Sequence, residues 1–500
     1  MSGRSGLCSV PRMRRSRWVT LAVAGLTATA SASGTALAAP STAPAPAWGP
    51  CPGGGRARCA DVTVPLSWAD PRGRIITLRL SRLSALDRKH RIGTLLVNFG
   101  GPGAPGAELV AEGGEALMPA PLRNRFDIVG FDPRGVGAST AVTCGGPALS
   151  ADVPVFPHSP AQFASVRRQS AAYGQSCVRS SPPGLAAHVD TPSAARDMDA
   201  IRAALGEKKV SYLGLSYGTY LGQTYARLFP HRVRTMVLDG AMDHAVGPRD
   251  FLYEEASALS TVFRRFAAWC SASASCALHG QNVLKVWDDL LARAARAPIP
   301  APNTKTGPKA MDDQAIRMVL PNLLMFGPSA VLPSSWTVLG DGIARARAGD
   351  ASVLADNTMV GQPQDAYAAI GCQSFPPQLR GYADTASRLR HVRAISPHTG
   401  GASEAWALTD LCASWPLPAS DPWGPQRVTG TPPILITSTR YDPSTPLVWA
   451  QGLHREIARS HLLVADTSGH TAFFNSACAR TAQATYLVTG TVPTTPTCTS

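Results

Sequence analysis

Short apolar runs alternate with stretches of helical spacing along the first half of the chain. Residues 94–99, 126–132 and 210–213 are mostly apolar runs of the length of a buried strand, and glycine follows closely after each. Residues 193–205 precede the third run and place apolar side chains at helical spacing. Parallel strands joined by helices produce this alternation. The pattern therefore predicts an α/β fold with functional loops at the carboxyl edge of a mostly parallel sheet.

The pattern changes between residues 246 and 425, where helical segments are separated by loops that contain proline and glycine. The helices predicted there span residues 251–270, 283–297, 312–325 and 335–348. Strand-type runs return at residues 433–438 and 461–465. These changes predict a sheet domain built from residues 59–245 and 426–500, with a mainly helical lid inserted between its two parts.

Residues 1–38 have the pattern of a signal peptide. Basic positions precede an uncharged stretch of small and apolar residues, which ends in the cleavage signal Ala36-Leu37-Ala38. An uncleaved membrane anchor is the alternative, but Thr, Ser and Gly interrupt the apolar run. Residues 39–58 are predicted as a linker and N-terminal segment, flexible up to residue 50 because Ala, Pro, Ser and Thr dominate there. The sequence therefore predicts a secreted protein with no stable membrane insertion after cleavage.

The chain of 500 residues has a formal net charge of +14, and five of its arginines lie in the predicted signal peptide, which leaves +9 for the mature chain. A basic exported protein is suited to electrostatic association with anionic cell-wall polymers. Nucleic-acid binding has little support, because no run of Lys or Arg with interleaved aromatic residues occurs.

Ten of the eleven cysteines follow the predicted signal peptide, and an even number in an exported chain predicts disulfides. Sequence alone leaves the connectivity open. Pairing between neighbours along the chain is expected, as Cys51–Cys59, Cys144–Cys177, Cys270–Cys276, Cys372–Cys412 and Cys478–Cys498. A metal site is the alternative use of these cysteines, but no C-x-x-C or clustered Cys/His spacing supports it. Neither a metal nor a cofactor is expected.

The pattern Gly-x-Ser-x-Gly occurs between a strand-type and a helix-type run, as Gly214-Leu215-Ser216-Tyr217-Gly218. This is the setting of a nucleophile elbow, in which a strained turn exposes the serine at the end of a strand. Glycines are needed beside the serine where a Cβ would clash. A chance match is the alternative, and the strand and helix on either side argue against it.

A serine nucleophile needs a base that takes its proton and an acid that orients the base. Asp442 follows one late strand and His470 follows the next, so Ser216, Asp442 and His470 stand in the order serine, acid, histidine. Asp239, at the end of an earlier strand, is the alternative acid. We predict that Ser216 is the nucleophile, His470 the base and Asp442 the orienting acid.

Two glycine-rich loops follow predicted strands. The loop Gly100-Gly101-Pro102-Gly103 is expected to supply the N–H of Gly101 to an oxyanion hole, which the N–H of Tyr217 completes. A simple tight turn is the alternative. In the second loop, residues 132–139, Asp132 and Arg134 are expected to pair and brace the loop rather than to take part in catalysis.

Together these motifs resemble those of the secreted tripeptidyl aminopeptidases and their proline-iminopeptidase relatives, a family with the α/β-hydrolase fold. The resemblance rests on residues 100–103, 132–139 and 214–222 and on the loops of Asp442 and His470. It covers nearly all of the mature chain and is weakest in the lid. Proline iminopeptidases have His before the two glycines, where this chain has Phe99, and this difference favours the tripeptidyl branch.

The resemblance implies an exopeptidase that releases short peptides, tripeptides foremost, from the free N-termini of peptide substrates. Relatives hold the substrate's protonated amine with lid carboxylates, and Glu254 and Glu255 are the candidates here. Stabilisation of a helix N-terminus is the alternative role for these two residues. A secreted carboxylesterase or lipase is the alternative function, because triad and fold are shared. A catalytically silent exported binding protein is a third reading.

Overall fold

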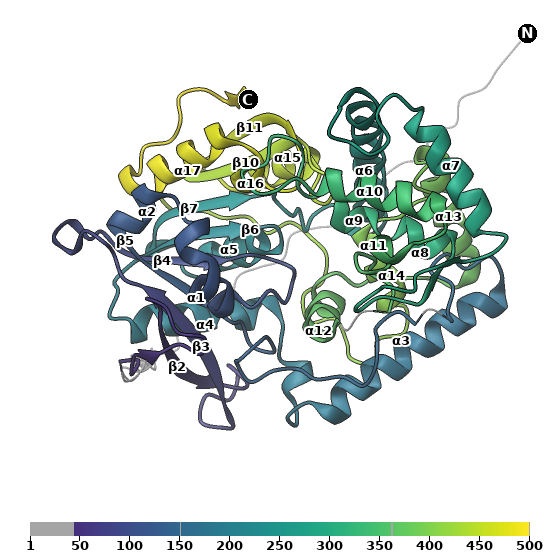
Figure 1. Ribbon diagram of the computed structural model, residues 1–500. Coiled ribbons are helices and arrows are strands. Elements are labelled where there is room, and N and C mark those ends of the chain that lie inside the picture. The colour runs from purple at the N-terminus through teal and green to yellow at the C-terminus, as the bar shows by residue number, and fades with distance from the viewer. Residues whose placement is uncertain (1–44, 151, 362–363, 500) are drawn as a thin grey trace, which may run out of the picture. The chain divides into compact units, whose positions relative to one another are not determined.

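A ten-stranded sheet organises the computed structural model, which describes residues 45–150, 152–361 and 364–499 (Figure 1). The strands in spatial order are β1 Gly49–Pro50, β2 Arg58–Pro65, β3 Ile75–Leu83, β5 Phe126–Phe131, β4 Gly93–Asn98, β6 Val210–Leu215, β7 Val233–Asp239, β10 Ile434–Tyr441, β11 Ser460–Ser468 and β12 Thr497–Cys498. Pairing is antiparallel from β1 to β5 and parallel from β5 to β12. The predicted mostly parallel sheet is confirmed.

Every residue of the central strands β4 and β6 is buried, and most of these residues are apolar, because both faces of the sheet are covered. In β4, Leu95 and Val97 belong to one apolar core and Leu96 to the other. In β6, Tyr212 and Leu213 divide between the two cores in the same way. Successive side chains of a strand point to opposite faces, so a strand buried on both sides needs a continuous apolar run. This is why the sequence pattern located β4 and β6.

Helices cover both faces of the sheet. The residues that pack with Leu95 and Val97 lie on α1 Gly106–Leu117, α2 Ala120–Arg125 and α17 Ala477–Thr489. The opposite core contains residues of α4 Thr191–Ala204, α5 Tyr217–Leu228 and α15 Leu447–Glu456. Parallel strands end at the same edge of such a layered fold, so the loops after β4, β6, β10 and β11 are brought together.

A long insertion lies between β7 and β10, and Figure 1 shows its helices gathered beside the sheet. These helices are α6 Gly247–Ala272, α7 Val283–Ala294, α8 Asp313–Arg317, α9 Leu320–Leu323, α10 Ser335–Ala348, α11 Ser352–Ala355, α12 Asp365–Ser374, α13 Tyr382–Ile395 and α14 Glu404–Leu411. A two-stranded sheet, β8 Ile299–Pro300 with β9 Ala310–Met311, joins them. Helix α3 Pro160–Ser180, which precedes the insertion in sequence, also packs here: Ser170 Oγ donates to the carbonyl of Leu411 at 2.7 Å.

The helix predicted over residues 312–325 is divided into α8 and α9. Pro321 stands at the start of α9, and proline has no N–H to donate to the preceding turn. The other three predicted insertion helices correspond to α6, α7 and α10. Helices α11 to α14 were not predicted, because their apolar positions do not follow a clear helical period.

The N-terminal edge of the sheet is more ordered than a flexible linker. Gly49 and Pro50 pair with Cys59 and Arg58, and a disulfide joins Cys51 to Cys59. The predicted signal peptide lies outside the described residues. In the part of the chain that the structure describes, no helix is long and apolar enough to cross a membrane. The other disulfides join Cys144–Cys177, Cys270–Cys276, Cys372–Cys412 and Cys478–Cys498, the neighbour pairs expected from the sequence.

The expected pairing of Asp132 with Arg134 is wrong. The carboxylate of Asp132 accepts hydrogen bonds from the backbone N–H groups of Ala107 and Ala138, at 2.8 and 2.9 Å. The guanidinium of Arg134 instead binds Asp197 on α4, at 2.7 Å from Nε and 2.6 Å from Nη2. Both side chains of this ion pair are buried, so each charge depends on the other for compensation.

Replacement of Asp197 by asparagine is therefore expected to destabilise the fold strongly. The change leaves a buried guanidinium without its countercharge, and we expect the free energy of unfolding to fall by about 3–5 kcal/mol. Chemical denaturation would measure this loss. Asp61→Asn is the matched control, because Asp61 pairs with Arg79 at the exposed surface and such pairs contribute at most about 1 kcal/mol. Equal losses in the two variants would contradict the expectation.

Candidate active site

Ser216 occupies a strained turn between β6 and α5. Its φ of 55° and ψ of −126° lie in a region that side chains rarely adopt. A Cβ at Gly214 would lie 2.4 Å from the carbonyl oxygen of Gly218, and one at Gly218 would lie 2.7 Å from Asn98 Oδ1. Both flanking positions therefore require glycine, as the elbow motif predicts. The turn holds the serine at the carboxyl end of a central strand.

His470 and Asp442 lie on neighbouring loops, after β11 and at the end of β10. His470 Nδ1 is 2.9 Å from Asp442 Oδ1 and 3.1 Å from Oδ2. The backbone N–H groups of Ser444 and Thr445 donate to Oδ1, and that of Thr471 donates to Oδ2. These donors fix the carboxylate, which in turn fixes the orientation of the imidazole.

Asp239, the alternative acid, has a different set of partners. Its carboxylate accepts hydrogen bonds from the N–H groups of Ala472 and Phe473, at 2.8 and 2.7 Å, and from the amide of Gln483. The first two donors begin α16 Ala472–Asn475, which directly follows the His470 loop. Asp239 thus anchors the backbone beyond His470. Both of its oxygens accept hydrogen bonds from groups other than the imidazole.

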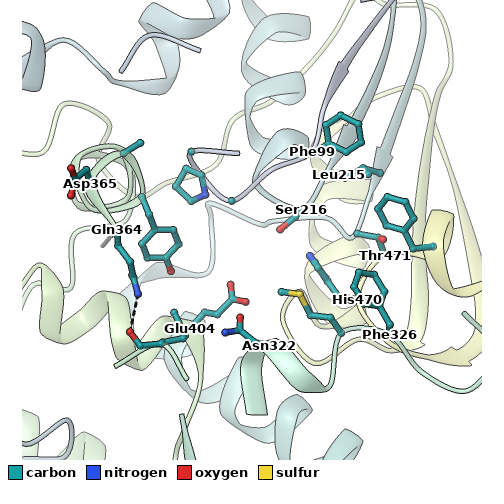
Figure 2. A pocket seen from close by; sticks show the side chains of 18 residues that line it. Phe99, Leu215, Ser216, Asn322, Phe326, Gln364, Asp365, Glu404, His470 and Thr471 are labelled. Carbon is teal, nitrogen blue, oxygen red and sulfur yellow. Dashed lines mark hydrogen bonds between the residues drawn. The ribbon is translucent and has the colours of Figure 1, made fainter. Parts of the chain in front are cut away.

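Ser216 and His470 both line a cavity of about 470 Å³ (Figure 2). The wall around them is mostly apolar and includes Phe99, Met325, Phe326, Met359 and Phe474. Its other polar members include Asn322, Gln364, Asp365 and Glu404. Most of these residues come from the insertion, so the sheet domain supplies the nucleophile and base while the insertion supplies much of the remaining wall.

The predicted oxyanion donors flank the serine. Gly101 lines the cavity, and the preceding residue lies so close to the elbow that a Cβ on Gly100 would be 2.8 Å from Ser216 Cβ and 3.2 Å from the nitrogen of Tyr217. Tyr217 is the first residue of α5, so its N–H has no carbonyl partner within the helix. An oxyanion formed beside Ser216 would therefore be near the N–H groups of Gly101 and Tyr217, the arrangement that an oxyanion hole requires.

Neither predicted amine-binding residue lines this cavity, although Glu255 lines a smaller pocket that Ser216 and Glu404 also line. Glu254 is not among the described residues that line it, and its Oε2 accepts a hydrogen bond from Trp449 Nε1 at 2.6 Å. Glu255 is buried and accepts hydrogen bonds from the backbone N–H groups of Glu404 and Ala405, at 2.7 and 2.9 Å. It therefore holds the N-terminus of α14.

Glu404 is a site residue that the sequence analysis missed. Figure 2 shows its side chain reaching into the cavity that Ser216 also lines. The hydroxyl of Ser444 donates a hydrogen bond to Glu404 Oε2 at 3.3 Å. Ser444 follows Asp442 by two positions in the sequence. Burial raises the pKa of Glu404 and of Glu255, and the neighbouring charge of Glu404 raises that of Glu255 further. The cavity thus holds an acidic group whose charge would be stabilised by a bound cation.

The pKa of His470 reflects two opposing effects. Burial lowers it, but the Asp442 carboxylate and the charge of Glu404 raise it, and the net shift is above the ordinary value of 6.5. A base must be neutral to take a proton from serine. A raised pKa therefore keeps His470 protonated, and inactive as a base, up to a higher pH.

The pH dependence of serine reactivity tests this balance. We expect the rate at which a fluorophosphonate labels Ser216 to rise with pH through a midpoint above 6.5. Glu404→Gln removes one of the negative charges that stabilise the imidazolium, so its midpoint should move to lower pH. The measurement is the labelling rate between pH 5 and 9, chosen to bracket the ordinary range of histidine. A midpoint that rose or did not move in this variant would contradict the account.

Comparisons with known proteins show the family of this chain. A family described as "alpha/beta hydrolase fold" matches residues 93–321, and one described as "TAP-like protein" matches residues 397–498. Serine protease Hip1 of Mycobacterium tuberculosis is 32% identical, over 88% of this chain and 86% of the relative. Tripeptidyl aminopeptidase of Streptomyces lividans is 31% identical, over 87% and 82%. Carboxylesterase B of Mycobacterium tuberculosis is 33% identical, over 87% and 85%.

Proposed function

The chain belongs to the α/β-hydrolase family with a TAP-like C-terminal region, and its similarity to a serine protease and a tripeptidyl aminopeptidase identifies it as a serine hydrolase. From this we propose that it is a secreted exopeptidase. It releases short peptides, tripeptides foremost, from the free N-termini of peptide substrates. Relatives named serine protease and tripeptidyl aminopeptidase support the peptidase activity, and the second name supports the tripeptide length. The predicted signal peptide and the five disulfides support export.

The observation that carries the proposal is the Glu404 carboxyl group in the cavity beside Ser216. A peptide with a free N-terminus brings an ammonium group, and a half-buried carboxylate in a mostly apolar cavity binds such a cation more strongly than water-exposed acids do. Glu404 takes the amine-binding role expected of Glu254 and Glu255. Glu255 contributes by holding the N-terminus of α14, on which Glu404 stands.

In the proposed reaction, the cavity aligns a peptide carbonyl with Ser216. Ser216 Oγ attacks the carbonyl carbon while His470 takes the hydroxyl proton, and the N–H groups of Gly101 and Tyr217 stabilise the oxyanion. His470 then donates that proton to the leaving amine, the peptide bond breaks, and an acyl-enzyme remains. Water, deprotonated by His470, attacks the acyl carbon, the ester bond to Ser216 Oγ breaks, and His470 returns the proton to that oxygen. Asp442 orients the imidazole and stabilises its charge in both steps.

The insertion accounts for a preference for short segments on the amine side of the cut. Asn322, Met325, Met359 and Gln364 come from the insertion and limit the cavity to about 470 Å³. Cavities of this size enclose small ligands rather than folded protein surfaces. A peptide whose ammonium group reaches Glu404 therefore has a fixed length between that group and the carbonyl at Ser216.

Glu404→Gln tests the amine site directly. We expect kcat/KM for a free-amine tripeptide p-nitroanilide to fall about 100-fold, because the substrate's ammonium loses its buried countercharge. Hydrolysis of p-nitrophenyl acetate, which has no amine, should change less than about threefold. Both rates are measured at a pH above the His470 midpoint. Glu254→Gln is the matched control, since its carboxyl group binds Trp449, and it should retain activity on both substrates.

Equal losses on the ester and the peptide in Glu404→Gln would exclude an amine-binding role. The alternative function is a secreted carboxylesterase, which the similarity to Carboxylesterase B favours. Rapid hydrolysis of p-nitrophenyl esters with no cleavage of any unblocked peptide p-nitroanilide would establish that alternative.

A further inference from the structure

A second cavity, of about 630 Å³, lies away from the active site. It is bounded by strands β2, β3 and β5 and by the ends of α1 and α2. Ile128 of β5 lines it and pairs with Leu95 of β4, near the amino ends of these parallel strands, whereas Ser216 stands at a carboxyl end. None of the residues that line this cavity also lines the catalytic one. It is therefore a separate site on the sheet domain.

The lining of this cavity, called the arginine pocket below, is strongly basic. Its charged residues are Arg56, Arg58, Arg82, Arg88, Arg123 and a single acid, Glu115. Glu115 lies 3.5 Å from Arg56 and 3.8 Å from Arg123. Among the described residues, Arg58, Arg82 and Arg88 form no ion pair. Their charges converge on a hollow that holds too little acid to balance them, which favours an anionic ligand.

Arg82 is half-buried, whereas Arg56, Arg58 and Arg88 are exposed. Its guanidinium lies 4.2 Å above the ring of Trp48, and its buried Nε has no hydrogen-bond partner among the described residues. Burial lowers the pKa of Arg82; the Asp127 carboxylate opposes this, and the charges of Arg88 and Arg58 add to it. A half-buried cation in a net positive field gains from a ligand that brings negative charge.

The loop that carries two of the arginines is held in shape by the protein itself. The Cys51–Cys59 disulfide closes it, and Arg56 and Arg58 lie between the two cysteines. Gly53, Gly54 and Gly55 have φ of 85°, 83° and 86°, which glycine adopts without the cost that a Cβ would impose. The disulfide therefore restrains the backbone that carries Arg56 and Arg58, and this reduces the backbone entropy lost on binding.

We propose that the arginine pocket binds a ligand with two or more phosphate groups, either a free oligophosphate or the phosphodiester chain of an anionic polymer. Each planar guanidinium donates two parallel hydrogen bonds to phosphate oxygens, and several guanidiniums around one hollow require several phosphate groups to satisfy them. The volume of about 630 Å³ is ample for more than one phosphate. The site goes beyond the proposed peptidase activity: a bound polymer would tether the enzyme while leaving the catalytic cavity open.

Isothermal titration calorimetry on the mature protein tests the proposal with inorganic tripolyphosphate and with a synthetic poly(glycerol phosphate) chain. Arg58 and Arg88 are exposed, so the double variant Arg58→Gln/Arg88→Gln is expected to fold normally. It should bind both probes at least about tenfold more weakly, because two charge-assisted contacts are lost. Arg168→Gln/Arg390→Gln is the control, since it removes the same charge from exposed positions outside the pocket. This control should bind within about twofold of the unmodified protein.

The outcomes separate the pocket from general attraction to a basic protein. Equal weakening in the control variant, or failure of the unmodified protein to bind either probe, would overturn the proposal. Citrate that bound as tightly as tripolyphosphate would overturn the assignment to phosphate. Tighter binding of poly(glycerol phosphate) than of tripolyphosphate supports the proposal and identifies the ligand as a polymer. Equal affinity for both probes also supports the proposal and identifies the ligand as a short oligophosphate. Unchanged fluorophosphonate labelling of Ser216 would show that the variants are folded.

Discussion

Ser216→Ala is expected to lower kcat on peptide p-nitroanilides by about 10⁴- to 10⁶-fold, the range typical of losing a serine nucleophile. Without the hydroxyl no acyl-enzyme forms, and only water attack assisted by the oxyanion donors remains. The loss should appear in kcat rather than in KM, because the cavity and Glu404 still bind the substrate. Steady-state rates normalised by total folded protein would measure it.

The stability of this variant provides the control. Alanine has a Cβ, so it keeps the same strain at φ 55° that serine bears. We therefore expect the free energy of unfolding to change by less than about 1 kcal/mol. If this variant unfolded readily, its kinetic loss could not be interpreted. Ser216→Gly, which lacks a nucleophile and tolerates the positive φ, would then replace it. Residual activity within tenfold of the unmodified enzyme would contradict a role for Ser216 as nucleophile.

Asp442→Asn should have the second-largest effect, a loss of about 10⁴-fold in kcat. Three backbone N–H groups, of Ser444, Thr445 and Thr471, point at the two carboxylate oxygens. An amide would replace one carboxylate oxygen with an N–H₂ group that opposes at least one of these donors, so the side chain would have to turn and would no longer hold His470 Nδ1 as the carboxylate does. The imidazole would lose its orientation, and the midpoint of its pH profile would fall because the negative charge is gone.

Asp239→Asn distinguishes the two candidate acids. Asp239 anchors the start of α16 through Ala472 and Phe473, so its replacement should lower stability while kcat per folded molecule stays within about tenfold. Active-site titration with a fluorophosphonate counts the folded molecules. A 10⁴-fold loss for Asp239→Asn together with near-normal activity for Asp442→Asn would reverse the assignment.

Local sequence patterns were sufficient where a signal is local. Strands β4 and β6 are apolar on both faces, and the elbow between β6 and α5 needs glycine at Gly214 and Gly218 for steric reasons. These features depend on a few consecutive residues. The positions of Asp442 and His470 followed from the rule that parallel strands end at one edge of a sheet.

The misses concern contacts between residues distant in sequence. Glu404 enters the site because Glu255, 149 positions earlier, binds the N-terminus of α14. No pattern around Glu404 distinguishes it from a surface acid. Arg134 was expected to pair with nearby Asp132, but backbone N–H groups occupy that carboxylate and Asp197, on a later helix, supplies the countercharge. Sequence shows which groups need partners, and packing decides which partners they find.

The most direct test of the central claim is the hydrolysis of matched p-nitroanilides by the unmodified mature enzyme. The set contains mono-, di- and tripeptides with free amines, each beside its N-acetylated form. The account predicts cleavage of the free-amine tripeptide at a rate about 100-fold or more above that of its acetylated form, since acetylation removes the cation that Glu404 binds. Equal rates on the acetylated and free-amine forms would contradict this prediction and would exclude an aminopeptidase.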